Sequence, residues 1–404
     1  MKTAVLPQRA AAAFLYAMLM TGAVAAQQSS EAPPPPGTMV FGPVTLTPSL
    51  TMKALGVDDN VFNDAVDPKS DFTFTLTPRA NIGLRARRLR LTYQTTADYV
   101  YYRTYASERG TNVTSEMRAD VDLGQLRPYA SVAAANTRNR LNAEVDTRAR
   151  HHDMTYGAGI TLRLASRTSL LLNARRGTIQ YEPDAIFRGV SLQQSFDGRL
   201  DRLEGGFGID LTPITTFTVV AQREEQRFDL SPLRNSSSWR VAPTLTFSPM
   251  GLLTGNASVG YRRFDAHDAG LPDFTGMVAS VTVGATIYGR HQLQGTYLHD
   301  LQYSYDPSTP YYLMNGGTLT WTTIVAGPFD VRGTGGRNLM DYRATQRARG
   351  SDVWSTYGGG IGFRFADRAR LGVNAEWLQR DSGRSPDRAY RNRRIFAALT
   401  WGAT

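Results

Sequence analysis

The chain has 404 residues, 41% of them hydrophobic, with a formal net charge of +10 and no cysteine. The lack of cysteine excludes a disulfide scaffold, thiolate metal sites and a cysteine nucleophile. No stretch after the first thirty residues is continuously apolar for the roughly eighteen residues that a membrane-spanning helix needs, which excludes a helical membrane protein. Nearly all the positive charge is arginine scattered among acidic residues, and this argues against a nucleic-acid partner, because such binders carry clustered basic stripes.

The N-terminal segment has the features of a secretory signal. Lys2 and Arg9 precede a short apolar run at residues 10–20, and Val24-Ala25-Ala26 offers small residues at the two positions that a signal peptidase reads, with cleavage after Ala25 as the alternative to cleavage after Ala26. We therefore predict a signal peptide over residues 1–26, cleaved after Ala26.

A polar leader follows the predicted cleavage site. It begins QQSSEAPPPP, and a segment of this composition buries too little apolar surface to fold. We assign residues 27–42 to a flexible, Pro-rich periplasmic leader and residues 43–404 to a single β-rich domain.

Apolar and polar residues alternate through the domain. Between Asp71 and Leu84 the apolar positions are Phe72, Phe74, Leu76, Pro78, Ala80, Ile82 and Leu84. Because successive side chains of a strand point to opposite faces of a sheet, this pattern predicts a two-sided strand. It lasts about fourteen residues, whereas strands of globular proteins have about five or six and a membrane-crossing strand about nine to eleven.

The same unit recurs eighteen times. The predicted strands are 43–55, 71–84, 88–104, 112–123, 126–140, 152–165, 168–182, 198–211, 214–228, 237–248, 252–264, 274–287, 290–305, 311–325, 328–344, 353–365, 369–380 and 389–402. Very short turns alternate with longer polar loops, a pattern typical of outer-membrane barrels. A β-propeller would need four short strands in each repeat of this length, and a sandwich would show core-like apolar runs. We predict an all-β fold, a transmembrane antiparallel up-and-down β-barrel of about eighteen strands in the bacterial outer membrane, with short periplasmic turns and longer extracellular loops.

The polar set of each strand should then line an aqueous lumen, since a barrel of this size encloses a channel. The predicted pore-lining residues are Arg79, Arg90, Asp98, Glu116, Arg118, Asp120, Arg127, Tyr129, Arg163, Arg202, Glu204, Arg240, Arg262, Asp300, Trp354, Arg364, Glu376 and Arg380. We expect such a mixed wall to suit a hydrated neutral or weakly acidic solute, with Tyr129 and Trp354 as flat surfaces for sugar rings. The alternative is that these charges pair across strands and only keep the wall rigid.

Catalytic and metal-binding signals are weak. His151-His152-Asp153 could bind a metal or serve a hydrolase, but adjacent strand residues point to opposite faces, which favours a solvated loop end. Asp58-Asp59-Asn60 could offer oxygen ligands to calcium, yet Lys69 stands where a calcium loop would need its glutamate. We expect no catalytic set, no metal and no cofactor.

Several short segments resemble the putative β-barrel porin type 2 family. They are Gly56-Val57-Asp58-Asp59-Asn60-Val61-Phe62, then Ser70-Asp71-Phe72 and Pro78, the strand segment at 255–264 (GNASVGYRRF), Pro272-Asp273-Phe274-Thr275-Gly276, and Asp300 with Tyr303-Ser304. His299 departs from the pattern, in which an arginine would precede the aspartate. The resemblance implies an outer-membrane barrel associated with exopolysaccharide secretion, working with a periplasmic polysaccharide export protein.

Three functions remain open. The first is an export conduit for an exopolysaccharide, the second a diffusion or uptake porin for small hydrophilic solutes, and the third a barrel-embedded surface enzyme. The longest predicted loops, 56–70 and 183–197, have about fifteen residues, so we expect no loop folded deeply into the lumen. An open lumen would favour the bulky polymer. The oligomeric state stays open.

Overall fold

The computed structural model describes residues 37–249, 251–343, 350–366 and 369–402. The predicted signal peptide and residues 27–36 of the predicted leader lie outside these ranges. Within them the chain is almost entirely antiparallel β-structure, interrupted by the short helix α2 (Leu192–Phe196) and three single-turn 3-10 helices. In the part of the chain that the structure describes, no helix is long and apolar enough to span a membrane.

Eighteen long strands form a closed antiparallel barrel, which confirms the predicted fold. Three much shorter strands, β1 (Met39–Phe41), β9 (Ile186–Phe187) and β10 (Val190–Ser191), lie outside this ring. The long strands are β2 (Val44–Asp58), β3 (Asp71–Ala86), β4 (Leu89–Tyr102), β5 (Gly110–Val121), β6 (Leu126–Arg140), β7 (Arg148–Arg163), β8 (Thr168–Tyr181), β11 (Gly198–Thr212), β12 (Thr215–Phe228), β13 (Ser236–Phe247), β14 (Leu253–Ala266), β15 (Phe274–Ile287), β16 (His291–Tyr303), β17 (Tyr311–Ala326), β18 (Phe329–Arg343), β19 (Ser351–Ala366), β20 (Ala369–Ser382) and β21 (Tyr390–Gly402).

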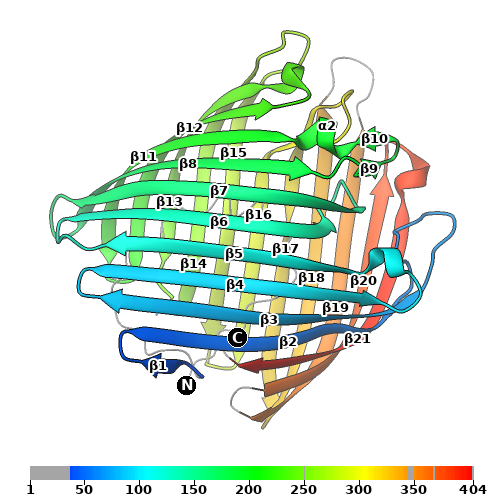
Figure 1. The fold of residues 1–404 in the computed structure, drawn as a ribbon, viewed down its shortest axis with the longest axis horizontal. Helices are drawn as coiled ribbons and strands as arrows, with labels where there is room; N and C mark the ends of the chain where they lie inside the picture. Colours follow the sequence, from blue (N-terminus) through cyan, green and yellow to red (C-terminus); the bar gives the residue numbers. More distant parts are fainter. Residues whose placement is uncertain (1–36, 250, 344–349, 367–368, 403–404) are drawn as a thin grey trace.

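The ring closes where the first long strand, β2, pairs with the last, β21. Around the rest of the ring each long strand pairs with the strands next to it in the chain, and β8 pairs directly with β11 because β9 and β10 form a separate hairpin. The strands of the near wall (β3–β8) cross those of the far wall (β14–β20) at a steep angle, as expected for strands tilted in a closed barrel (Figure 1). Closure removes the free edges that an open sheet would expose to lipid.

The first residues of the described chain already belong to the paired structure. β1 forms a tight hairpin with the start of β2, in which Met39 pairs with Leu46 and Phe41 with Val44. Residues 39–41, which the sequence analysis places in the leader, are therefore strand in the structure.

A β-bulge interrupts β2. The register with β3 shifts between Lys53 and Gly56, and Ala54 has a positive φ of 54°. A bulge inserts extra backbone into one strand and changes which side chains face inward. The alternation breaks at this point, so the predicted strand ends at residue 55 although β2 continues to Asp58.

Turn lengths differ between the two ends of the barrel, as predicted. One end carries tight turns, in which Gly124, Gly289 and Gly327 adopt the positive φ that glycine tolerates without strain. The other end carries the longer connections, among them residues 182–197, which contain β9, β10 and α2. Following the topology of outer-membrane barrels, we assign the tight turns to the periplasm and this second end, called the outer end below, to the cell exterior.

The two faces of the wall differ in polarity and in accessibility. In β3, Thr73 and Thr75 are buried inside the barrel, whereas Phe72 and Leu76, on the opposite face, are exposed at the outer surface. Val259 in β14 also occupies an outward-facing position of its strand, and its side chain is 49% exposed. Outward apolar residues of this kind match a surface solvated by lipid.

We predict that Val259→Arg and Val283→Arg impair membrane insertion, whereas Thr282→Arg is tolerated. Val283 pairs with Gly255 on the outward parity shared by Val259, and Thr282 pairs with Asn256 on the inward parity. An arginine facing lipid costs roughly 2–4 kcal/mol at the bilayer midplane. The measurement is the fraction of heat-modifiable folded barrel in outer-membrane preparations, and equal assembly of all three variants would contradict the facing assignment.

Candidate functional site

The strand register places all eighteen predicted pore-lining residues on the inner face. Directly paired residues of neighbouring strands point to the same side of a sheet, so the facing can be followed around the ring. Arg90 pairs with Asp120, and Asp120 pairs with Tyr129. The residues fall into three groups: Arg79, Arg90, Asp98, Glu116, Arg118, Asp120, Arg127, Tyr129 and Arg163 on β3–β7; Arg202, Glu204, Arg240, Arg262 and Asp300 on β11–β16; and Trp354, Arg364, Glu376 and Arg380 on β19 and β20. That they border a solute path remains a prediction.

The first group contains a stacked arginine. The Arg118 guanidinium donates three hydrogen bonds to the Asp120 carboxylate at 2.8–3.0 Å and lies 3.7 Å from the centre of the Tyr129 ring. The Tyr129 hydroxyl donates to Asn173 Oδ1 at 3.1 Å. Arg118 therefore covers one face of the ring that was expected to be free for a sugar.

The wall of β3 and β4 is buried towards the outer end and accessible towards the tight turns. Asp98 accepts hydrogen bonds from Lys53 Nζ at 3.1 Å and from the Thr77 hydroxyl at 2.5 Å, and Thr77 is buried. Nearer the tight turns Asn81 and Arg90 are exposed. The inner face is thus open to water from the periplasmic side.

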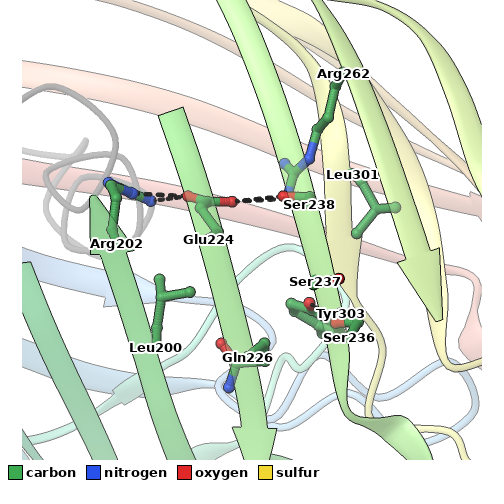
Figure 2. Close-up of a pocket in the computed structure, with 10 residues that line it drawn as sticks. All are labelled: Leu200, Arg202, Glu224, Gln226, Ser236, Ser237, Ser238, Arg262, Leu301 and Tyr303. Atoms are coloured by element: carbon green, nitrogen blue, oxygen red, sulfur yellow. Dashed lines mark hydrogen bonds and ion pairs between the residues drawn. The ribbon is translucent and has the colours of Figure 1, made fainter. Parts of the chain in front are cut away.

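The second group forms a buried network that we call the charge clasp, made of Arg202, Glu224, Arg240, Arg262 and Asp300. Arg202 Nε donates to Glu224 Oε1 at 2.7 Å, and Arg262 Nη2 donates to Glu224 Oε2 at 2.8 Å (Figure 2). The other amine of Arg262 donates to Asp300 Oδ1 at 2.9 Å, and Arg240 Nη1 donates to Asp300 Oδ2 at 3.3 Å. Three cations and two carboxylates from five strands are so joined, with Glu204 at 4.0 Å from Arg202.

The clasp is buried because the end of β16 bends into the barrel. Pairing of β16 with its neighbour β15 stops at Ala279 and His299, and Asp300 reaches past β15 to β13 and β14. Beyond it, Leu301 and Tyr303 lie against the inner faces of β12–β14 (Figure 2), and the Tyr303 hydroxyl is 2.6 Å from Ser236 Oγ. A cavity of about 20 Å³, large enough for one water, remains between the layers.

A loop from the opposite wall meets this bent segment. Residues 141–147 connect β6 to β7, and Glu144 within them is fully buried. Its carboxylate accepts from the Ser304 hydroxyl at 2.6 Å and from the Tyr305 backbone N–H at 3.2 Å. Six strands separate β7 from β16 along one side of the ring and eight separate β6 from β17 along the other, so the loop crosses the lumen.

Neighbouring loops complete the cover. Val145 packs with Phe187, Leu192 and Tyr305 in an apolar cluster, and Arg188 forms an ion pair with Asp387 in the connection before β21. All these contacts lie at the outer end, so the loops cover the mouth of the lumen and the expectation that no loop folds deeply into it stays a prediction. The cover itself was not foreseen. Loop length did not reveal it because a connection of seven residues, 141–147, crosses the barrel by resting on the inward-bent β16.

The third group holds this cover from the far wall. Arg380 donates to Asp352 Oδ2 at 2.6 Å and to the backbone oxygens of Ala143 and Glu144, both at 3.1 Å. Trp354 packs against the buried cluster around Tyr342. It is therefore packed against the cover and is partly buried, so only part of its surface is left for a sugar ring.

The remaining members of this group lie elsewhere on the wall. Arg364 contacts Asp330 at 3.3 Å, and Arg370 contacts the same carboxylate at 2.6 Å. Glu376 pairs in register with Arg394, which binds Asp58 at 2.9 Å. These contacts fix the carboxylates to the wall and leave more arginine than acid on it.

Sequence reasoning missed Glu144, Asp352 and Arg388. Asp352 is buried, accepts a hydrogen bond from Arg380 and lies 3.4 Å from Arg388. The three missed residues lie in or next to loops, where the alternation of apolar and polar residues gives no prediction. A usable signal was present in residues 141–145 (LNAEV), where apolar side chains interrupt a loop otherwise expected to be polar.

The segments that carried the family resemblance meet in this region. Arg262 of the 255–264 segment binds Asp300, and Phe264 packs on Tyr303. Ser304 binds Glu144, and the Pro272 carbonyl accepts from the Tyr311 hydroxyl at 2.5 Å. Segments far apart in sequence thus build one structural unit, the covered outer end.

No metal-binding group of three or more suitable side chains occurs among the described residues. His151 is buried beside Thr137 at 3.1 Å and Asp153 at 3.4 Å, and it lies within β7, not at a solvated loop end. Asp58 is engaged by Arg394 and by Asn392 at 2.8 Å, which leaves it tied to protein donors.

A family model described as "Putative beta-barrel porin 2" matches residues 34–400. Among solved structures, the chain is similar to OccK2 (OpdF) of Pseudomonas aeruginosa in complex with glucuronate, with 11% identity, a TM-score of 0.52, and coverage of 89% of this chain and 98% of that one. It is also similar to the outer membrane protein OpdK of the same species (10% identity, TM-score 0.49, coverage 88% and 98%). A comparison with curated proteins finds no matching relative. At this identity the similarity to OccK2 shows the fold alone.

We predict that Asp300→Asn lowers the heat stability of the barrel. The change removes a buried carboxylate from Arg240 and Arg262, and breaking such a pair costs about 3–5 kcal/mol. The measurement is the temperature at which the folded band disappears in heat-modifiability gels. Asp341→Asn is the control, because Asp341 pairs with Arg343 at the exposed surface, where a pair contributes about 0–1 kcal/mol. Equal shifts for both variants would refute a stabilising role of the clasp.

Proposed function

Because the chain belongs to the putative β-barrel porin 2 family of outer-membrane barrels, we propose that this porin-like channel passively admits small hydrophilic solutes and prefers anionic ones. The observation that carries the proposal is the loop 141–147, which crosses the lumen and docks on the opposite wall through Glu144. A constriction of this kind limits the size of what passes.

The charge of the inner face supports the preference for anions. The predicted pore-lining set holds ten arginines and six carboxylates, and Arg90 is exposed near the periplasmic end. In a wide aqueous lumen salt screens each charge over about 10 Å at 0.1 M, so the arginines attract a passing anion without holding it. The hydroxyl and amide side chains between them exchange hydrogen bonds with a solute at small net cost, about 0.5–1.5 kcal/mol each.

A second candidate is export of an exopolysaccharide, with a periplasmic polysaccharide export protein delivering the chain to the tight-turn end. The resemblance of the short segments to the family and the hydroxyl-rich wall favour it. This function requires the loop 141–147 to leave the lumen, because the loop reaches across the polymer's path and docks on the opposite wall through Glu144. We do not favour the barrel-embedded enzyme, because the hydroxyl of Thr137 and the imidazole of His151, which lie 3.1 Å apart, are both buried and so closed to a surface substrate.

We predict that replacing residues 142–146 with two glycines raises single-channel conductance several-fold in planar bilayers. The replacement removes Glu144 and Val145, and with them the anchor on Ser304 and the apolar contact that holds the cover. Deletion of the exposed residues Ala269 and Gly270 from another outer loop is the matched control. Unchanged conductance in the 142–146 variant would show that this loop does not obstruct the channel.

Acid should favour the closed channel. Burial raises the pKa of Glu144, against the opposing hydrogen bonds from Ser304 and Tyr305 and the charges of Arg388 and Arg380. A raised pKa means that docking of the loop is most stable below the ordinary glutamate pKa and loses this contribution as the pH rises through the raised value. We expect conductance to increase from about pH 4 to about pH 8, and Glu144→Gln to remove the dependence. Conductance that falls over this range would contradict the docking model.

The two transport functions separate in a deletion strain. Under the proposed function, the strain keeps normal surface polysaccharide and loses uptake of particular small anions, which is measured with a panel of labelled solutes. Loss of surface polysaccharide, with polymer accumulating in the periplasm, would instead establish export.

A further inference from the structure

The outer surface carries a charged feature that the transport function does not use. Arg337 on β18 and Arg391 and Arg393 on β21 all have outward parity and are exposed. Their side chains make no ion pair or hydrogen bond with any residue that the structure describes. Arginine on a lipid-facing surface is unfavourable unless an anion compensates it. Three unpaired arginines on β18 and β21, two strands with β19 and β20 between them, therefore need a partner.

Most other outward arginines of the outer half are paired with a carboxylate, and Arg223 on β12 lies over the Trp239 ring, 5.4 Å from its centre. Arg176 binds Asp201 on the next strand, and Arg227 and Arg263 each bind a carboxylate two residues away in their own strands. Among the described residues of the outer half, the exposed outward arginines Arg337, Arg391 and Arg393, which have neither a carboxylate nor an aromatic ring as partner, therefore gather on one side of the barrel, between β18 and β21.

Aromatic side chains mark the depth of this patch. Arg393 pairs in register with Trp377, and Trp377 pairs with Tyr357, which pairs with Gly335 one row below Arg337. Outward tyrosine and tryptophan at one level of a barrel form the girdle at the boundary between acyl chains and headgroups. The three arginines thus lie where lipid headgroups are, and β18 and β21 are three strand spacings, roughly 14 Å, apart.

A groove continues from the patch into the apolar band. It has a volume of about 510 Å³ and runs over the outer face of β15–β19, with Val281, Val283 and Leu319 on its sides and Arg337 at its border. A hydrocarbon chain fits such a surface, and it lies next to the cations that would hold a charged headgroup.

We propose that this face binds a phosphorylated glycolipid of the outer leaflet, with phosphate groups on Arg337, Arg391 and Arg393 and an acyl chain in the groove. Guanidinium groups bind phosphate through paired, charge-assisted hydrogen bonds, so the chemistry of the headgroup matches the three free cations. The apolar groove beside the cations favours a phosphorylated headgroup that carries an acyl chain over a free phosphate ion. The lipid then forms an annular contact on one side of the barrel and is independent of what passes through the lumen.

The test uses the purified barrel in detergent and native mass spectrometry to count lipid A molecules retained on each barrel. Arg337→Gln, Arg391→Gln and Arg393→Gln combined should reduce retention at least fivefold, and Arg176→Gln, Arg227→Gln and Arg263→Gln combined, a matched triple of paired arginines, should leave it unchanged. Lipid A without phosphate should bind the natural protein as weakly as phosphorylated lipid A binds the first triple variant. Equal retention by the natural protein and both triple variants would overturn the proposal.

A second variant tests the groove without touching a charge. A side chain added at Gly335 meets no atom within 4 Å, so Gly335→Leu fills the groove without a backbone clash. We expect reduced retention of lipid A with unchanged heat stability. If added inorganic phosphate displaces lipid A completely and Gly335→Leu has no effect, the patch is a simple anion site and the lipid assignment is wrong.

Discussion

The structure depends on one constraint: the backbone must satisfy all its hydrogen bonds within the protein, because the lipid around it offers no donors or acceptors. In lipid every strand edge must find a partner, and the pairing of β2 with β21 supplies the last one. Once the ring is closed, strand length, tilt and the strict alternation of side chains follow, because each residue must face either lipid or the interior. The bulge at Ala54 shows the same requirement locally, since it shifts the register while the ladders on both sides of β2 continue.

Inside the ring a different balance applies. The inner face is polar, and at the outer end it is removed from water by the protein's own loops, so its charges must be compensated where they are buried. The charge clasp achieves this by alternating cations and carboxylates over five strands, and Asp352 plays the same part for Arg380 on the other side. Buried ion pairs stabilise little by themselves, but they specify geometry, because an unpaired member is costly. Here the geometry they specify is the inward bend of β16.

The barrel was predictable from the sequence because its cause is local and repeated. Alternation over about fourteen residues indicates that a segment is a strand, how long the strand is and which side chains face inward. Arg118, Arg262 and Asp300 are therefore predictable as inner-face residues from the sequence alone. The covered outer end was not predictable in this way. Asp300 obeys the alternation, yet its partners Arg240 and Arg262 lie beyond the strand next to it, and nothing in the pattern of β16 announces that its pairing with β15 stops at His299. Glu144 lies in a loop, where the two-residue alternation of a strand gives no information, and its partner Ser304 is 160 residues away in the chain.

The end of pairing between β15 and β16 has a mechanical consequence. Beyond Ala279 and His299 the ends of β16 and β17 are joined to β15 and β14 by side chains such as Tyr311, Phe264 and the clasp, with no backbone ladder on that side. The outer rim therefore contains a seam, at which buried side chains do the joining that backbone hydrogen bonds do along the rest of the junction between β15 and β16.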